Sequence, residues 1–241
     1  MAQSVSAIEV YETLLVRCGE LVEPDRHWQR FERSAQLAGL PALDRGLVVE
    51  SALSTCASPE ARSKDGRLRL VWGEEGLVEA KWEQIPDHFL PATVVWSSQV
   101  RDQDSHLTGA KVWRQRQNLA AAAEAEAAAA DEALMLNGRG LVAEGYRSNV
   151  FAVIDGIAWT PPLSDGALPG TVRGWLLSRQ PALVRERPLR PEELIEAEEL
   201  FLTSAIRLAQ PVGRLAGQDF TVPGNITERL LALLASRRRT R

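Results

Sequence analysis

The sequence predicts an α+β fold in two lobes, a small N-terminal α/β lobe and a larger, strand-rich C-terminal lobe. Its 241 residues, 45% apolar and 25% charged, can bury one large core or two modest ones. Strand and helix patterns alternate over residues 8–82, whereas residues 132–160 hold two successive strand pairs, and the polar stretch 97–108 is typical of a connecting loop. We therefore expect a first domain at residues 1–100, an interdomain loop at residues 101–110 and a second domain at residues 111–241.

The first lobe is expected to contain two hairpins and two helices. Residues 8–21 alternate apolar and polar side chains around a turn at Cys18-Gly19, which predicts the first hairpin. Apolar residues then recur at helical spacing after Asp25, and Gly39 marks the end of that helix. The remaining expected elements are a helix at 43–56 and strands at 67–72, 77–82 and 94–96.

The second lobe is expected to begin with a helix and to continue mainly as strands. Residues 114–130 are rich in Ala, Gln, Glu and Arg and contain neither Gly nor Pro, a composition that favours a helix. Asn137-Gly138 and Asp155-Gly156 predict hairpin turns, because both turn positions tolerate a positive φ. The expected strands are 132–136, 140–143, 150–154, 157–160 and 199–203, and the expected later helices are 171–179, 191–197 and 225–235.

Composition and charge argue against several classes of function. A formal net charge of -4 gives no general attraction to nucleic acid, and the basic run 237–241 is expected to be a frayed, solvated end. Two cysteines, Cys18 and Cys56, without a CxxC motif or a histidine cluster suggest neither a disulfide framework nor a metal site. No segment approaches the ~20 apolar residues of a membrane span, and residues 1–10 lack a secretory pattern. We expect a cytoplasmic enzyme with a small-molecule substrate and without nucleic-acid or membrane partners.

Lysine chemistry has few candidates in this chain. Only three of the 28 basic residues are lysines, at positions 64, 81 and 111. Lys111 follows Gly109-Ala110 and lies near Arg114 and Arg116, and a lysine attacks carbonyl groups when desolvation or nearby positive charge lowers its pKa. On local context alone, an exposed lysine that opens a helix is the commoner explanation.

Two further segments have features that suit a phosphorylated, aromatic ligand. Residues 164–173 lead into a helix whose first N–H groups can hold phosphate, with Gly170 allowing close approach and Thr171 supplying donors. Glu144 closes a strand and offers the acidic partner that keeps a pyridine nitrogen protonated. A plain turn before a helix and a solvated glutamate explain the same residues, and spacing alone does not decide between these alternatives.

Taken together, these segments resemble the class IV aminotransferase family, whose members are pyridoxal-phosphate enzymes. Seven elements occur in the order typical of that family. They are Tyr11-Glu12-Thr13, His27-Trp28-Gln29-Arg30-Phe31, Gly109-Ala110-Lys111, Glu144 with Ser148-Asn149-Val150-Phe151, Thr160-Pro161-Pro162, Leu168-Pro169-Gly170-Thr171-Val172-Arg173, and Phe201-Leu202-Thr203 with Pro211-Val212. The resemblance implies fold type IV, the D-amino acid aminotransferase-like fold, and a homodimer.

The resemblance also implies roles for individual residues. Lys111 would hold pyridoxal 5'-phosphate as a Schiff base and move protons, Glu144 would contact the pyridine nitrogen, and Arg30 would bind the phosphate. Backbone groups of Thr171 and Val172 would complete the phosphate site, and Ala205 stands where the family often has a phosphate-binding Ser or Thr. The cofactor-binding residues implied are Lys111, Arg30, Glu144, Asn149, Thr171, Val172, Ser204 and Ala205.

Within the family, the chain resembles the 4-amino-4-deoxychorismate lyases, which form p-aminobenzoate and pyruvate for folate biosynthesis. Residues 131–136, Asp-Glu-Ala-Leu-Met-Leu, match a pattern common in these lyases. Thr13 matches a threonine near the reacting carbon, so the implied catalytic residues are Lys111 and Thr13. Trp113-Arg114 stands where the lyases usually have Leu-Asn. An aminotransferase for branched-chain or D-amino acids is the alternative, and a paralogue without turnover is a third hypothesis, against which the retained Lys111 and Glu144 argue.

Overall fold

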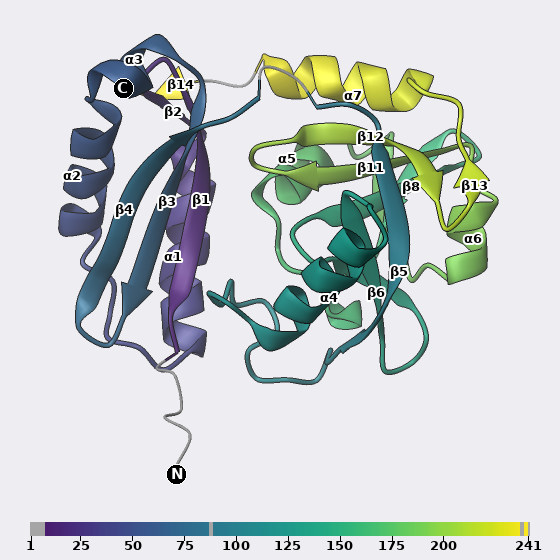
Figure 1. Cartoon of the computed structure of the whole chain (residues 1–241), viewed down its shortest axis with the longest axis horizontal. Helices are drawn as coiled ribbons and strands as arrows, with labels where there is room; N and C mark the ends of the chain where they lie inside the picture. Colours follow the sequence, from purple (N-terminus) through teal and green to yellow (C-terminus); the bar gives the residue numbers. More distant parts are fainter. Residues whose placement is uncertain (1–7, 87–88, 237–238, 241) are drawn as a thin grey trace. The chain divides into compact units, whose positions relative to one another are not determined.

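The structure is a computed structural model that describes residues 8–86, 89–236 and 239–240 (Figure 1). Contacts between residues divide these into two compact units, each with helices packed on a sheet. The first unit comprises residues 8–86, 110–113 and 239–240, and the second comprises residues 89–109 and 114–236. The predicted α+β class is therefore confirmed.

The first unit is built on a sheet with the strand order β14-β2-β1-β3-β4. Its strands are β1 (Val10–Arg17), β2 (Glu20–Val22), β3 (Gly66–Gly73), β4 (Gly76–Gln84) and β14 (Arg239–Thr240). Its helices are α1 (Pro24–Leu37), α2 (Arg45–Cys56) and α3 (Pro59–Ser63). Both predicted hairpins and both longer helices are present, whereas α3 was not predicted because five residues carry too little periodicity.

One face of this sheet forms the core of the first unit. Alternate residues of β1, such as Val10 and Leu14, pack with Leu68 of β3 and with Trp28 and Phe31 of α1. Because side chains alternate across a strand, the residues between them in β1 and β3 belong to the opposite face. That opposite face carries the site residues of the first unit.

The basic C-terminal run is only partly described. Arg239 and Thr240 form β14, which pairs antiparallel with β2. The expectation of a frayed end is therefore wrong for these two residues, because the backbone hydrogen bonds of β2 were open to a further strand. The other residues of the run, 237, 238 and 241, lie outside the described residues, as do residues 1–7 of the N-terminal segment.

The second unit is built on a larger mixed sheet with the strand order β10-β9-β8-β11-β12-β5-β6-β7, to which β13 adds beside β12. Its strands are β5 (Ala92–Arg101), β6 (Glu132–Asn137), β7 (Val142–Gly145), β8 (Asn149–Ile154), β9 (Ile157–Thr160), β10 (Val184–Glu186), β11 (Glu199–Ser204), β12 (Leu208–Leu215) and β13 (Gln218–Asp219). Its helices are α4 (Arg116–Ala127), α5 (Thr171–Arg179), α6 (Pro191–Ile195) and α7 (Asn225–Ala235), with a short 3-10 helix at Leu163–Asp165. Phe151 of β8 stacks on Phe201 of β11 in its core, with ring centroids 4.8 Å apart.

The units divide at positions other than those expected for the domains. The sequence prediction assigns β5 to the first lobe, whereas β5 pairs in parallel with β12 and β6 of the second unit. Conversely, residues 110–113 belong to the first unit, because Val112 bridges to Val10 of β1. Both differences arise from pairings between residues far apart in sequence, which local patterns do not report.

The polar stretch 97–108 is only partly a loop. Residues 97–101 continue β5, and the predicted strand at 94–96 is therefore too short. Ser97 and Gln99 both hydrogen-bond to the Glu124 side chain of α4, so their polarity is satisfied by a helix packed beside the strand. Among the described residues, no helix combines the length and the apolar character that crossing a membrane requires.

Candidate active site

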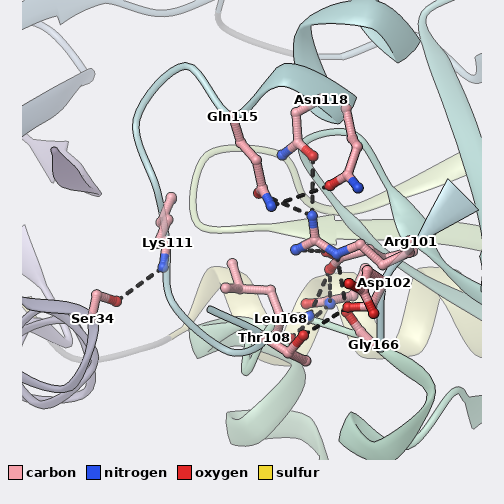
Figure 2. Close-up of polar contacts among 12 residues, drawn as sticks. Ser34, Arg101, Asp102, Thr108, Lys111, Gln115, Asn118, Gly166 and Leu168 are labelled. Carbon is pink, nitrogen blue, oxygen red and sulfur yellow. Dashed lines mark hydrogen bonds and ion pairs between the residues drawn. The ribbon is translucent and has the colours of Figure 1, made fainter. Parts of the chain in front are cut away.

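The backbone of Lys111 is fixed by β1 and α1. The Tyr11 N–H donates to the Lys111 carbonyl at 2.9 Å. The Lys111 N–H donates to Ser34 Oγ at 3.0 Å, as Figure 2 shows. Lys111 is half-buried and lies five residues before Arg116, where α4 begins. The explanation of Lys111 as an exposed residue that opens a helix is therefore wrong.

An aromatic ring faces the lysine amine. Lys111 Nζ lies 4.6 Å from the centre of the Tyr11 ring, and the Tyr11 ring meets the Trp113 ring edge to face at 4.9 Å. The Arg69 guanidinium in turn lies 4.8 Å from the Trp113 ring. These contacts place one cation against each ring of an aromatic pair, and a contact of this kind stabilises the charge of the cation.

Thr13 and Arg69 share a face of the sheet with this cluster. Thr13 follows Tyr11 by two residues and pairs directly with Arg69 across β1 and β3. Arg69 Nε is buried and has no hydrogen-bond partner within the described part of the chain, and the Arg69 guanidinium is 4.0 Å from Glu83. This face therefore offers an amine, a hydroxyl and an incompletely satisfied cation, a combination suited to an anionic ligand.

Arg30 lies on the opposite, helix-covered side of the sheet in a buried charge cluster. Its Nε and Nη2 donate to the two oxygens of Glu12 at 2.6 and 2.8 Å, and His27 Nδ1 lies 2.7 Å from Glu12 Oε2. Burial raises the pKa of Glu12, but the charges and hydrogen bonds of Arg30 and His27 outweigh it and hold that pKa well below its usual range. Burial lowers the pKa of His27 against the opposing effect of Glu12. Glu12 holds the Arg30 side chain in place, and the contact of Arg30 with phosphate stays a prediction.

Glu144 is buried in the second unit and accepts hydrogen bonds from three residues. Arg101 Nη2 lies 2.8 Å from Glu144 Oε1, and both side chains are about 5% exposed or less. The Leu168 N–H donates to Glu144 Oε2 at 2.8 Å, and Asn149 Nδ2 donates to the same oxygen at 3.2 Å. The explanation of Glu144 as a solvated glutamate at a strand end is therefore wrong. One cation and two N–H donors favour its ionised form.

Arg101 is held on all sides at the end of β5. Its Nε donates to the Gly166 carbonyl at 3.2 Å, and its Nη1 donates to Gln115 and Asn118 at 3.0 and 3.2 Å (Figure 2). Sequence reasoning missed this residue, because the stretch that contains it was assigned to a loop. Its position at the end of a strand was the only feature of the sequence that could have indicated a role for Arg101.

The N-terminus of α5 is open to an anion. Its N-cap is Gly170, so no side chain caps the N–H groups of the first turn, which begins with Thr171 and Val172. A Cβ on Gly170 would lie 1.9 Å from Asn149 Oδ1, so only glycine fits beside Asn149. Thr203, which pairs with Asn149 across β8 and β11, has a buried hydroxyl without a hydrogen-bond partner among the described residues. Uncapped N–H groups and an unpaired hydroxyl are donors that suit phosphate.

The backbone conformation of Gly109 explains why the Gly-x-Lys motif begins with glycine. Gly109 has a φ of +90°, and a Cβ there would lie 3.9 Å from the Pro169 ring within the second unit. A left-handed backbone of this kind favours glycine. From Gly109, beside the Leu168-Pro169-Gly170 turn, the chain passes through Ala110 to Lys111.

Residues 9–215 match the family described as Amino-transferase class IV. The chain belongs to this family. Class IV aminotransferases are pyridoxal-phosphate enzymes, so the predicted enzyme class and cofactor are confirmed at the level of the family.

Curated relatives match part of the chain. A probable branched-chain-amino-acid aminotransferase of Aquifex aeolicus is 40% identical over 86 residues, 34% of this chain and 28% of that protein. A putative branched-chain-amino-acid aminotransferase of Methanocaldococcus jannaschii is 34% identical over 112 residues, 44% of this chain and 39% of that protein. The chain thus spans less than half the length of either relative.

Solved structures match nearly the whole of this chain. A fold IV-transaminase from Curtobacterium pusillum has a TM-score of 0.84 and 26% identity, covering 99% of this chain and 92% of that one. A putative 4-amino-4-deoxychorismate lyase from Legionella pneumophila has a TM-score of 0.85 and 24% identity, covering 95% and 91%. A hypothetical aminotransferase from Mycobacterium tuberculosis in a PLP-bound form has a TM-score of 0.85 and 24% identity, covering 97% and 89%. The predicted fold type IV is confirmed, and the last two likenesses concern the fold alone.

The structure groups the predicted site residues into two sets. In the first unit, Lys111 and Thr13 lie on one face of the sheet. In the second unit, Glu144 and Asn149 lie beside the turn that leads into Thr171, whereas Ser204 ends β11 and Ala205 begins the turn after it. The open helix N-terminus and the unpaired Thr203 hydroxyl fit the phosphate of the family's cofactor. Residue roles, the homodimer and the cytoplasmic location stay predictions.

Proposed function

We propose that this protein is a pyridoxal-phosphate-dependent 4-amino-4-deoxychorismate lyase that holds its cofactor covalently on Lys111. The observation that carries the proposal is one face of the sheet, on which the Tyr11 and Trp113 rings link Lys111 to Arg69 and Thr13 pairs with Arg69. Release of an enolpyruvyl group needs a base for a carbon-bound proton, an acid for the leaving oxygen and a cation for the substrate's carboxylates. These three side chains supply one group each.

The protons balance without a second substrate. Lys111 Nζ removes the proton from the amine-bearing carbon of the substrate. The protonated Lys111 then returns this proton to the enolpyruvyl oxygen, directly or through Thr13 Oγ1, as the bond from that oxygen to the ring breaks, and the ring becomes aromatic. Acid and base groups of this kind contribute about 10² to 10⁴-fold in rate. The products are p-aminobenzoate and pyruvate, and no keto acid is consumed.

Residues of the second unit hold the cofactor in this proposal. When bound, pyridoxal phosphate supplies an electron sink for the charge left on the substrate carbon. Glu144, ionised beside Arg101, would accept a hydrogen bond from the ring nitrogen, and the uncapped first turn of α5 at Thr171 and Val172 would bind the phosphate. The further residues assigned to the cofactor are Arg30, Asn149, Ser204 and Ala205.

A branched-chain aminotransferase is the second candidate. The observation that favours it is the name of the curated relatives, which are 34–40% identical over their matched segments. The same lysine serves transamination, and Arg69 serves an amino-acid carboxylate. The two candidates differ in whether turnover requires an amino acceptor.

The purified protein distinguishes the candidates. Cofactor attachment predicts an absorbance band at about 410–420 nm. Release of p-aminobenzoate from 4-amino-4-deoxychorismate without a keto acid supports the lyase. Turnover of branched-chain or D-amino acids that depends on a keto acid supports the aminotransferase and contradicts the lyase, and protein that acquires no band after incubation with the cofactor contradicts both.

A further inference from the structure

Glu132 of β6 is a fully buried acid for which the proposed reaction has no role. Its Oε2 accepts a hydrogen bond from Ser148 Oγ at 2.8 Å. The same oxygen lies 3.8 Å from Arg147 Nε and 4.0 Å from Arg207 Nη1. A carboxyl group without exposed surface, placed between two arginines from different turns, calls for an explanation beyond packing.

The first of these turns joins Glu144 to Asn149. A Cβ on Gly145 would lie 2.8 Å from Glu132 Cδ, so the Glu132 side chain fills the space directly under Gly145. The turn closes through the Gly145 N–H, which donates to the Ser148 carbonyl at 2.8 Å. Glu132 thus supports the backbone between two residues assigned to the cofactor.

The second turn follows β11 and contains Ser204 and Ala205. The Arg207 N–H donates to Ser204 Oγ at 3.1 Å, which ties the arginine to the start of the turn. Arg207 Nη1 is buried and finds no hydrogen-bond partner in the described chain, and its guanidinium lies 5.8 Å from the Phe89 ring. Glu132 is the carboxylate that the structure places within ion-pair reach of Arg207.

The electrostatics of Glu132 make its charge responsive near neutral pH. Burial raises its pKa to about 7, although the Ser148 hydrogen bond and the charges of Arg147 and Arg207 oppose the shift. Tyr146 and Asp131 are the other ionisable groups that act on this cluster. The attraction between Glu132 and Arg207 therefore weakens as the pH falls through about 7.

We propose that Glu132 is a positioning residue that holds the 145–148 turn through Ser148 and the 204–207 turn through Arg207, and thereby sets the affinity for pyridoxal phosphate. This inference rests on the proposed cofactor site. It assigns to Glu132 an effect on binding that is exerted through two turns and not by contact with the cofactor.

Glu132→Gln tests the inference, because it keeps the shape and the Ser148 bond but removes the charge. The measurement is the dissociation constant of pyridoxal phosphate, from release by the loaded protein and retitration, between about pH 6 and 8.5. We expect Glu132→Gln to bind about tenfold more weakly than the wild type at the upper pH and almost equally at the lower pH. The exposed Glu126→Gln on α4 is the matched control and should follow the wild type throughout.

A double-mutant cycle identifies the route of the effect. Arg207→Gln should weaken binding in the same pH range, and Glu132→Gln should add nothing further in that background. Additive losses, or a pH profile of Glu132→Gln that parallels the wild type, would overturn the inference while leaving the proposed function intact. If Glu132→Gln does not fold, a flattened pH profile of Arg207→Gln supports the inference and an unchanged one overturns it. Wild-type protein that binds no cofactor overturns both proposals.

Discussion

Arg101 Nη2 lies 2.8 Å from Glu144 Oε1, and the two side chains form a buried ion pair at the centre of the second unit. Every nitrogen of the guanidinium has a partner, so Arg101 cannot turn away when a ligand competes for Glu144. The carboxylate that the proposed function assigns to the ring nitrogen is thus held in place and kept ionised by a residue that sequence motifs do not contain.

Removal of Arg101 should destabilise the fold strongly. Arg101→Met leaves Glu144 buried beside two N–H donors but without its cation, which is expected to lower the free energy of unfolding by about 3–5 kcal/mol. Denaturant unfolding measures this loss, and Arg101→Met/Glu144→Gln should recover part of it. The exposed pair Arg214 and Asp219, 2.9 Å apart, supplies the control, since Arg214→Met should cost less than about 1 kcal/mol. Equal losses at both sites would contradict a structural role for the buried pair.

Lys111→Ala should abolish cofactor attachment. Without the amine, the band at about 410–420 nm and the adduct that borohydride reduction traps should both disappear. Lys64→Ala and Lys81→Ala provide matched controls, because these lysines pair with Gln84 and Glu83 at the first unit's sheet and should leave both signals unchanged. A trapped adduct at another residue in Lys111→Ala would show that the assignment to Lys111 is wrong.

Thr13→Val should separate chemistry from cofactor binding. The change keeps the shape of the β-branched side chain but removes the hydroxyl that the proposed lyase uses as an acid. We expect the kcat for p-aminobenzoate release to fall about 10²-fold or more, with cofactor affinity unchanged. Thr221→Val, at an exposed site of the second unit, should retain full activity. A Thr13→Val protein with unchanged kcat would leave proton donation to Lys111 alone.

Local patterns predict the elements of this fold better than their pairing. The hairpin at Cys18-Gly19 and helix α4 follow from turn chemistry and helix propensity, which act over a few residues. β12 was not predicted, because Pro211 and Gly213 weaken its strand pattern while pairing with β11 and β5 supplies the missing stability. The extent of β5 was misjudged for a similar reason.

Ordered motifs identified the candidate site residues, but not the environments that give them their properties. Thr13, Lys111, Glu144 and Asn149 are assigned through the resemblance of these motifs to those of the family. The ring of Tyr11 against the lysine amine and the Arg101 charge against Glu144 depend on strands that meet only after folding. Because such contacts join residues that are distant in sequence, they are not predicted from a single sequence.

Glu132 should lower stability at neutral and higher pH, the reverse of its expected effect on cofactor binding. A carboxyl group whose pKa is raised by folding binds its proton more tightly in the native state, so stability falls as pH rises from the unfolded value of 4.5 towards the folded value of about 7. Glu132→Gln removes this penalty, and we expect the cofactor-free variant to exceed the wild type by roughly 3 kcal/mol at about pH 8 and to match it at about pH 4.5. Urea unfolding at both pH values measures the difference. A variant that is less stable at both pH values would mean that Glu132 stabilises the fold. A variant that is more stable but binds the cofactor more weakly would show that Glu132 acts on cofactor binding and not on stability.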